Sequence, residues 1–356
     1  MEKLLILNPG STSTKIACYE DEKQLFVESI SHSADTIAQY DTIIDQYAFR
    51  KEMILNVLKD KGIQLEELTG IVARGGSLPP IKAGAYFVND DMVWQLKNNP
   101  AMEHASNLGA VIAASIANPL DIPAFIYDGV TVDEMWPILK ITGFKEVTRK
   151  GIGHNLNTRA AAIRYAREHD KAYKDCKLIV VHLGGGISVT LQYEGKVVDI
   201  INDEDGPFAP ERAGGLPIQS FTSYFGASGM STKEMLKELK SRGGLVNHLG
   251  VNDSREVEKM IQNGDGHARL IYDAMALNVA RCVGEEAATV AGDIEGIVLT
   301  GGIAYSEYFT SEVKKNIEWI APVTIYPGEN EMESLALGGL RVLRGEEEAH
   351  TFVKTE

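Results

Sequence analysis

The stretch that decides the fold is Leu-Leu-Ile-Leu-Asn-Pro-Gly-Ser-Thr-Ser-Thr-Lys-Ile-Ala, residues 4–17. An apolar run enters Asn8-Pro9-Gly10, hydroxyl residues occupy 11–14, and a second apolar run follows Lys15. This order predicts a strand, a tight turn of small polar groups and a returning strand. Hydroxyls, an amide side chain and free backbone N–H groups in such a turn suit phosphate and metal-bound water. An ordinary hairpin turn is the alternative, and this stretch alone does not choose between them.

The same pattern returns about half a chain later. Residues 178–191, Leu-Ile-Val-Val-His-Leu-Gly-Gly-Gly-Ile-Ser-Val-Thr-Leu, again give a strand, a small-residue turn and a strand. A further strand is expected after each copy, at 25–30 and at 197–201. The match in strand order, turn position and spacing predicts a duplicated three-strand unit, with chance similarity of two β-meanders as the alternative.

The length of 356 residues favours two domains. Apolar strands at 70–74 and 124–128 alternate with helical patterns, which indicates an α/β protein. Residues 151–155, Gly-Ile-Gly-His-Asn, interrupt the pattern before a long helix, so we expect a domain boundary near residue 150.

Composition and charge limit the partners. Hydrophobic residues make up 44% of the chain and charged residues 24%, as in soluble globular proteins. A net charge of −15 argues against nucleic acid or an anionic membrane surface as partner, so an anionic ligand needs locally placed cations. Cys18, Cys176 and Cys282 have no metal-type spacing, and buried thiols in a reducing cytoplasm are expected. We expect no signal peptide, because Glu2 and Lys3 lead straight into a short predicted strand, and no apolar run reaches the length needed to span a membrane.

Three turns rich in glycine or hydroxyl residues follow predicted strands, at 8–14, 184–188 and 300–302. The dinucleotide fingerprint does not fit, because the glycines at 184–186 lead into a strand rather than a helix. No Gly-Lys-Ser/Thr follows a strand, so a P-loop is excluded too. Together the turns suit a phosphate chain held by backbone N–H groups from both sides of a cleft.

As an ordered set, these motifs resemble the acetate and sugar kinase, Hsp70 and actin superfamily, and within it the acetokinase family, most closely its butyrate kinases. Residues 8–15 are similar to the opening Asn-x-Gly-Ser-Ser-Ser-x-Lys signature, 182–188 to the second phosphate loop, and 300–303 to the adenosine loop. Asp253-Ser254-Arg255 resembles an Asp-x-Arg element near the nucleotide, and Asn330-Glu331 an Asn-Glu element near magnesium. The resemblance covers about residues 4–344.

The resemblance implies an α/β, duplicated ribonuclease H-like (actin-like ATPase) architecture of two lobes with a central cleft. The expected lobes are an N-terminal lobe, 1–149, on which a C-terminal helix at 331–356 packs back, and a C-terminal nucleotide-binding lobe, 150–330.

The resemblance also implies ATP or ADP with Mg²⁺ as cofactors. The implied nucleotide-binding residues are Asn8, Ser11, Thr12, Lys15, His182, Gly184, Gly185, Gly186, Asp253, Arg255, Gly301, Gly302 and Ile303. Asn8 and Glu331 are the metal candidates, with Glu333 as the alternative to Glu331. Magnesium keeps most of its waters in such sites, so few protein ligands are needed.

Two arginines are candidates for the acceptor side. Arg74 and Arg212 each stand beside a glycine turn, where a guanidinium could hold an anionic ligand bidentately; a surface salt bridge is the alternative. The resemblance gives Arg212 the role of substrate residue and phosphoryl clamp. At 71–76 the chain departs from acetate kinases, whose stretch resembles Arg-x-x-His-Gly-Gly, because Ile71 replaces the arginine and Arg74 the histidine. An equivalent role for Arg74 is therefore left open.

Three further polar residues complete the candidate site. Asp128 ends an apolar strand, where a carboxylate can orient water, magnesium or an arginine, or simply begin a turn. His154 resembles the family histidine that hydrogen-bonds the transferring phosphoryl group, and His104 resembles a second family histidine near the substrate; either is otherwise structural. The predicted catalytic residues are Arg74, Asp128, His154 and Arg212, and the predicted substrate residues are Arg74, His104 and Arg212.

The predicted reaction is butanoate + ATP = butanoyl phosphate + ADP, by direct in-line transfer with Mg²⁺. Acetate, propionate or a branched acid such as isobutyrate are alternative substrates. A nucleotide-driven conformational module of the actin or Hsp70 type, without a small-molecule acceptor, is the alternative from another class. The expected partners are the small carboxylate, its acyl phosphate and a second copy of the chain, without nucleic acid or membrane, in the cytoplasm.

Overall fold

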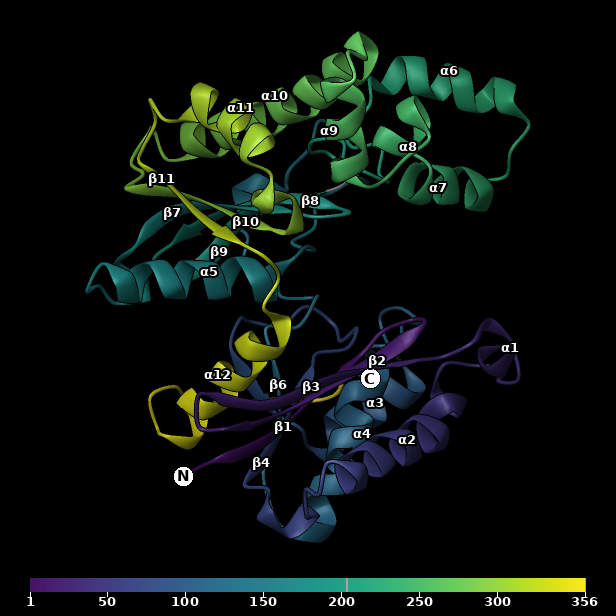
Figure 1. Cartoon of the computed structure of the whole chain (residues 1–356), viewed down its shortest axis with the longest axis vertical. Coiled ribbons are helices and arrows are strands. Elements are labelled where there is room, and N and C mark those ends of the chain that lie inside the picture. The colour runs from purple at the N-terminus through teal and green to yellow at the C-terminus, as the bar shows by residue number, and fades with distance from the viewer. Residues whose placement is uncertain (203, 356) are drawn as a thin grey trace. The chain divides into compact units, whose positions relative to one another are not determined.

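The computed structural model describes residues 1–202 and 204–355 and contains two compact units. The first unit combines Met1–Asp133 with Asn330–Glu356, and the second is Glu134–Glu329 (Figure 1). Asp203, within the lobe expected at 150–330, and Glu356, at the end of the helix expected at 331–356, lie outside the described residues.

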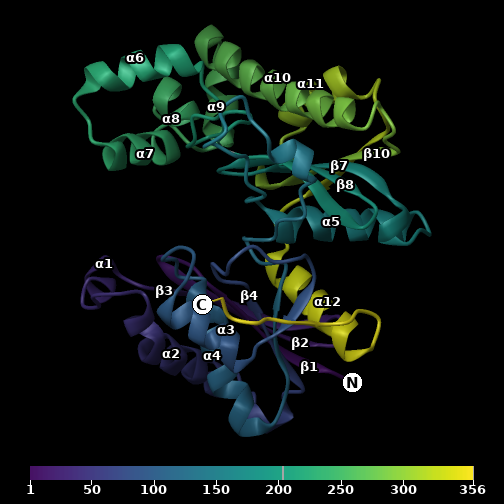
Figure 2. The ribbon, with the colours of Figure 1, turned by 180° about the vertical axis from the view of Figure 1, so that it is seen from behind.

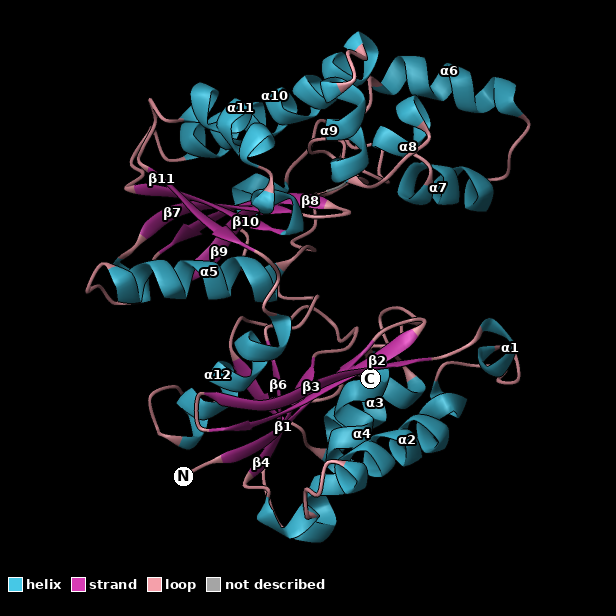
Figure 3. Ribbon diagram, viewed as in Figure 1, coloured by secondary structure: helices cyan, strands magenta, loops and turns pink. Residues whose placement is uncertain are grey.

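The first unit is built on a sheet that has seven strands among its described residues, in the order β12-β5-β6-β4-β1-β2-β3 (Figure 3). β1 and β2 form the predicted hairpin, with Asn8 opposite Lys15 and Pro9 opposite Thr14. β1 also pairs in parallel with β4, and β4 with β6. The strands are β1 (Lys3–Pro9), β2 (Ser13–Glu20), β3 (Lys23–Ser31), β4 (Gly70–Arg74), β5 (Ala85–Phe87), β6 (Ala124–Tyr127) and β12 (His350–Thr351).

Helices cover both faces of this sheet, because its central strands are apolar on both sides. Leu5 and Leu7 pack into the core under α4, whereas a Cβ at Gly339 of α12 would lie 3.3 Å from Leu4 and 2.4 Å from Val72, so α12 takes the opposite face closely (Figure 1). The helices are α1 (Ala34–Ile37), α2 (Tyr47–Asp60), α3 (Asp90–Asn98), α4 (Asn107–Ala117) and α12 (Glu331–Leu343).

The C-terminal segment differs from the helix expected at 331–356. The helix ends at Leu343, and Gly345 follows with a φ of 72°, a left-handed conformation that terminates helices. The chain then forms β12, which pairs in parallel with β5, and Phe352 is buried in the core of the first unit. The segment after α12 is therefore held by the pairing of β12 with β5 and by burial of Phe352, and not by a continuation of the helix.

The second unit repeats the strand order of the first. Among the described residues its sheet has the order β11-β10-β7-β8-β9, in which β7, β8 and β9 form an antiparallel meander and β7, β10 and β11 are parallel. The first unit arranges β6-β4-β1-β2-β3 in the same way, so the predicted duplication is confirmed and includes two further strands. The strands are β7 (Lys177–Leu183), β8 (Ile187–Tyr193), β9 (Lys196–Ile201), β10 (Gly296–Gly301) and β11 (Val323–Pro327).

Some helices of the second unit cover the faces of its sheet, and others lie away from the sheet. α5 packs on Leu178, Val180 and Val298, and α10 packs on the opposite face, which carries Ile179 and Leu299. α6 and α7 lie away from the sheet (Figure 2). The helices are α5 (Asn155–Glu168), α6 (Ile218–Ser228), α7 (Thr232–Ser241), α8 (Gly244–Leu249), α9 (Ser254–Gln262), α10 (Gly266–Thr289) and α11 (Glu307–Ile317).

The boundary between the units differs from the one expected near residue 150. Residues 134–149 belong to the second unit, because Trp136 N–H donates to the Val198 carbonyl at 2.9 Å and Arg149 forms ion pairs with Asp199 at 3.0 Å and Asp205 at 2.8 Å. The glycines at 151–155 mark the start of α5 instead.

Two expectations from composition concern thiols and membranes. The three cysteines are free and buried. Over the described ranges, the helices are too short or too polar for any of them to cross a membrane.

Candidate functional site

The first predicted phosphate turn lies at the end of the β1–β2 hairpin. Gly10 N–H donates to the Ser13 carbonyl at 2.7 Å, which closes the turn, and Ser11 and Thr12 are exposed at its tip. Asn8 precedes the turn and is only 5% exposed, whereas Lys15 on β2 is exposed. The turn thus presents small polar groups to solvent while its base is buried.

One carboxylate connects three predicted site residues of the first unit. Asn8 Nδ2 donates to Glu331 Oε2 at 2.7 Å, and Arg74 Nη1 lies 3.3 Å from Glu331 Oε1. The parallel pairing of β1 with β4 brings Asn8 and Arg74 to the same sheet edge, and Glu331 arrives as the first residue of α12. The salt-bridge alternative for Arg74 is realised, and its partner is the predicted metal carboxylate. Glu333 is exposed on α12. Burial, and then the charge of Glu333, raises the pKa of the Tyr19 hydroxyl to about 12.

These residues fit a magnesium ion that keeps most of its waters. In the part of the chain that the structure describes, no group of three or more His, Cys, Asp or Glu residues could hold a metal. One carboxylate and one amide, as Glu331 and Asn8 provide, leave the remaining positions for water and phosphate oxygens, which is the arrangement magnesium prefers.

His104 and Asp128 lie near Arg74 in the first unit. His104 Nδ1 accepts the Ser106 N–H at 3.2 Å; burial and then the Arg74 charge lower the pKa of His104, so its imidazole is neutral at pH 7. Asp128 is buried, accepts the Gly84 N–H at 2.8 Å and has a φ of 42°, a left-handed conformation that is strained for aspartate. A Cβ at Gly75 would lie 2.7 Å from Gly129, so the turns that carry Arg74 and Asp128 touch.

The second predicted phosphate loop, Gly184–Gly186, is in direct contact with Arg212. A Cβ at Gly186 would lie 2.4 Å from Arg212 Nη1 and 2.6 Å from its Cζ, so the guanidinium rests on the bare glycine backbone. At Gly185 the nearest group to such a Cβ is Glu211 Oε2 at 4.0 Å. Gly184–Gly186 and Arg212, predicted separately as a phosphate loop and a phosphoryl clamp, therefore lie in contact with each other.

A stacked pair of histidines adjoins this loop. The rings of His154 and His182 are 3.9 Å apart with an interplanar angle of 14°. His154 Nδ1 lies 3.0 Å from Ser188 Oγ, and His182 Nε2 lies 3.3 Å from Glu329 Oε1. The stack fixes the plane of His154, and Glu329 is a contact that the sequence analysis missed. Its position in the Pro327–Glu331 turn, directly before the Asn-Glu element, is the signal that could have pointed to it.

The third glycine turn and the Asp-x-Arg element are the remaining predicted nucleotide-binding residues of the second unit. Gly301 has a φ of 95°, and a Cβ there would lie 2.4 Å from the Leu183 carbonyl oxygen, so this turn packs on the end of β7. Asp253 caps α9 and pairs with Arg255 at 2.6 Å; the hydrogen bonds from Arg255 lower the pKa of Asp253 to about 2. The Arg255 side chain is otherwise exposed.

Another residue that sequence patterns did not identify is Arg50 on α2. It follows Phe49 in a stretch of mixed apolar and charged residues, and its charge is its only signal in the sequence. In the structure its guanidinium is buried and donates to the first phosphate turn.

The fold of the chain is the actin-like ATPase fold, which it shares with solved acetate and sugar kinases. It matches an acetate kinase from Porphyromonas gingivalis (TM-score 0.79, 19% identity, 96% of this chain and 100% of that chain). It also matches a propionate kinase from Francisella tularensis subsp. tularensis SCHU S4 (0.75, 18%, 95% and 99%). A sugar-complexed ROK family protein from Streptococcus pneumoniae TIGR4 is more distant (0.55, 14%, 97% and 100%).

The model of the acetokinase family matches residues 145–324, half of the chain. The chain therefore belongs to the acetokinase family and is a carboxylate phosphotransferase. This membership disfavours the conformational module without a small-molecule acceptor.

The contact between Gly186 and Arg212 yields a paired prediction. Gly186→Ala should displace the guanidinium and lower kcat on the order of 100-fold, the typical loss when one donor to a developing charge is removed. Gly284→Ala, on α10 of the same unit, should stay within about threefold of wild type, because no group lies within 4 Å of a Cβ there. Steady-state kinetics with a carboxylate and ATP measure both; equal losses in the two variants would contradict a specific seat for Arg212.

Proposed function

We propose that the protein catalyses ATP-dependent phosphorylation of butanoate to butanoyl phosphate, and the reverse reaction. The observation that carries the proposal is the seat of Arg212 on Gly186, beside the His154–His182 stack. A guanidinium and an imidazole held next to a glycine loop are suited to a phosphoryl group, whose transition state spreads negative charge over its oxygens.

The acceptor needs little activation. A carboxylic acid with a pKa near that of a glutamate side chain is already ionised at pH 7, so no general base is required. The residues instead have to bring two anions together, the carboxylate and the phosphate. Arg212 offsets charge on the transferring group, and His154, whose orientation is fixed by His182 and Ser188, donates to it. Asp128 acts through its position near Arg74 rather than by accepting a proton.

We assign the nucleotide to the glycine turns of the second unit and the metal to the first unit. Glu331 and Asn8 would hold magnesium through its waters, and the ion would supply positive charge that offsets the charge of a phosphate group. Arg74 shares the Glu331 carboxylate with Asn8, and its guanidinium would be the cation on this side that is placed to hold the carboxylate of the acid.

The preference for butanoate rests on the resemblance of the sequence motifs to butyrate kinases, and the chain departs from acetate kinases at 71–76. Ile71 occupies the position of the arginine in the acetate kinase stretch Arg-x-x-His-Gly-Gly. Its side chain is fully buried in the apolar core of the first unit. The cation of this stretch is Arg74, at the end of β4, where it pairs with Glu331. Acetate, propionate and isobutyrate remain the alternative acceptors, since an acetate kinase and a propionate kinase share the fold of this chain.

Hydroxylamine trapping tests the reaction and its substrate together. The protein is incubated with ATP, Mg²⁺, hydroxylamine and one acid from a panel of acetate, propionate, butyrate, isobutyrate and valerate. We expect acyl hydroxamate with several acids and the highest kcat/KM with butyrate. A maximum at another acid would overturn the preference for butanoate, and no hydroxamate with any acid would overturn the carboxylate kinase itself.

We further propose that the active form is a homodimer that self-associates through α6. This helix, Ile-Gln-Ser-Phe-Thr-Ser-Tyr-Phe-Gly-Ala-Ser, has no charged and no buried residue, and Ile218 and Tyr224 are 77% and 61% exposed. Two chains of net charge −15 repel each other, and an uncharged apolar helix is the surface on which a self-complementary contact costs least.

Light scattering coupled to size exclusion tests this partner. The wild-type protein should elute as a dimer and the double variant Ile218→Glu, Tyr224→Glu as a folded monomer. Ile138→Glu is the control, because Ile138 is 73% exposed elsewhere in the same unit, and it should leave the dimer intact. A monomeric wild type, or a dimeric double variant, would contradict association through α6.

A further inference from the structure

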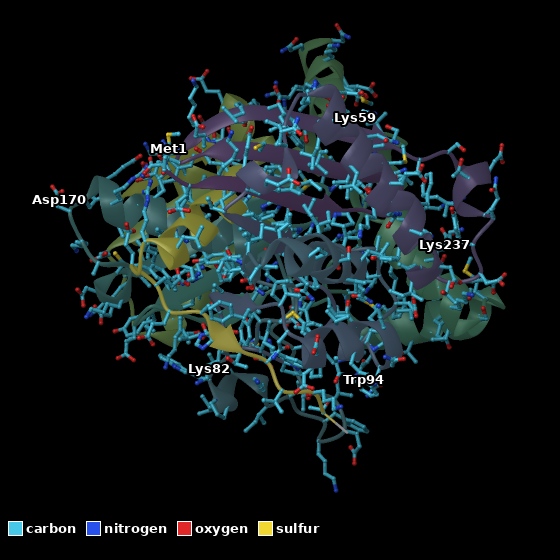
Figure 4. The ribbon with its side chains drawn as sticks, turned by 90° about the horizontal axis from the view of Figure 1, so that it is seen from below. Met1, Lys59, Lys82, Trp94, Asp170 and Lys237 are labelled. Carbon is cyan, nitrogen blue, oxygen red and sulfur yellow. The ribbon has the colours of Figure 1, made fainter. Side chains whose placement is uncertain are left out.

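Arg50 lies beneath the first phosphate turn and is 1% exposed. It stands near the start of α2, whose last turn carries the exposed Lys59 (Figure 4). Nη1 donates to the Gly10 carbonyl at 2.8 Å, the Ser13 carbonyl at 3.3 Å and Thr14 Oγ1 at 3.1 Å, and Nη2 donates to the Ser11 carbonyl at 3.3 Å. One buried side chain thus holds most of the turn.

The charge of Arg50 has no anionic partner among the described residues. Its remaining donors, Nε and Nη2, go to the neutral Gln46 Oε1 at 3.1 and 2.8 Å. Burial lowers the pKa of Arg50, but a guanidinium stays protonated at neutral pH. Burial, and then the Arg50 charge, lowers the pKa of the neighbouring His32, which is therefore neutral at pH 7. A buried cation without a counterion is costly, and buried charges are ordinarily paired.

The hydrogen bonds of Arg50 also decide where the turn's amides point. In a trans peptide the C=O and the following N–H point in opposite directions. Because the carbonyls of Gly10 and Ser11 face Arg50, the N–H groups of Ser11 and Thr12 face away from it. Neither N–H donates to any group in residues 1–202 or 204–355, and both residues are exposed. The turn therefore presents two unused donors above a buried positive charge.

We propose that Arg50 is a positioning residue for phosphoryl transfer. It aims the N–H groups of Ser11 and Thr12 at a phosphate group, and its uncompensated charge strengthens their attraction for that anion. The inference rests on the proposed function, because it takes the phosphate to be the one transferred between ATP and the acid. Arg50 acts through the turn and does not touch the substrate.

Gln46→Glu separates the charge of Arg50 from its hydrogen bonds. Glutamate accepts the same two bonds from Arg50 and cancels its charge through an ion pair. We expect an unchanged or higher Tm together with at least a tenfold lower kcat/KM for acyl phosphate in the ATP-forming direction, and weaker stabilisation by pyrophosphate in thermal unfolding. A purely structural role predicts the same Tm with wild-type kinetics and pyrophosphate binding, and that result would overturn the proposal.

Gln24→Glu is the matched control. Gln24 accepts a hydrogen bond from the Tyr19 hydroxyl in the same unit, so this variant adds an equal charge away from the turn and should keep wild-type kinetics. If Gln46→Glu lowers the Tm, Arg50→Lys decides: the ammonium keeps the charge but cannot hold all three carbonyls. A kcat at least tenfold lower per folded molecule then supports the proposal, and an unchanged kcat overturns it.

The pyrophosphate readout keeps this test independent of the proposed function. A wild-type protein that phosphorylates no acid, but loses pyrophosphate binding in Gln46→Glu, would overturn the proposed reaction and leave the role of Arg50 at an anion site standing. Conversely, normal carboxylate kinase activity with unchanged kinetics and pyrophosphate binding in Gln46→Glu would overturn the role of Arg50 alone.

Discussion

The parallel pairing of β1 with β4 and of β7 with β10 is the constraint on which both residue sets depend. Parallel neighbours end at the same edge of a sheet, so the polar residues that follow each strand are collected there. In the first unit this brings Asn8 and Arg74 to one carboxylate, Glu331. In the second it sets the loop after β7 against Gly301 at the end of β10. The two candidate residue sets therefore follow from this repeated arrangement of strands.

Charge at these edges is balanced differently in the two units. In the second, Arg212 rests on a glycine, which lets a guanidinium approach the backbone at a distance that a side chain would forbid. In the first, Arg74 is held by Glu331, whereas Arg50 lies buried against neutral acceptors only. A protein with a net charge of −15 thus holds a few cations at these edges, where the proposed function requires an anionic ligand to bind.

Alternating and apolar strands made much of the fold predictable from the sequence. The hairpin at 4–17, its copy at 178–191 and the α/β pattern are local patterns, and the structure confirms them. The C-terminal strand was not predictable, because two residues carry no periodicity and their pairing with β5 is a long-range contact. The two compact units divide at residue 133 rather than near 150 for a similar reason, because the ion pairs of Arg149 with Asp199 and Asp205 have no signature in the sequence.

Candidate site residues were predictable where a charged or imidazole side chain lies next to a glycine turn in the sequence. Arg212, His154 and His182 are such residues, and the structure places them together, although their roles stay predictions. Arg50 and Glu329 were missed because their partners are far along the chain: an arginine on a helix face reads as an ordinary surface residue until the fold buries it.

In the proposed reaction, a carboxylate oxygen attacks the terminal phosphorus of ATP. Butyrate labelled with ¹⁸O in both carboxyl oxygens, ATP and Mg²⁺ can be followed by ³¹P NMR, in which an ¹⁸O bonded to phosphorus shifts the resonance. This attack gives butanoyl phosphate in which one oxygen on phosphorus is ¹⁸O. ATP consumption that yields phosphate free of ¹⁸O, with no acyl phosphate at any time, would mean that water is the acceptor and would rule out attack by the carboxylate.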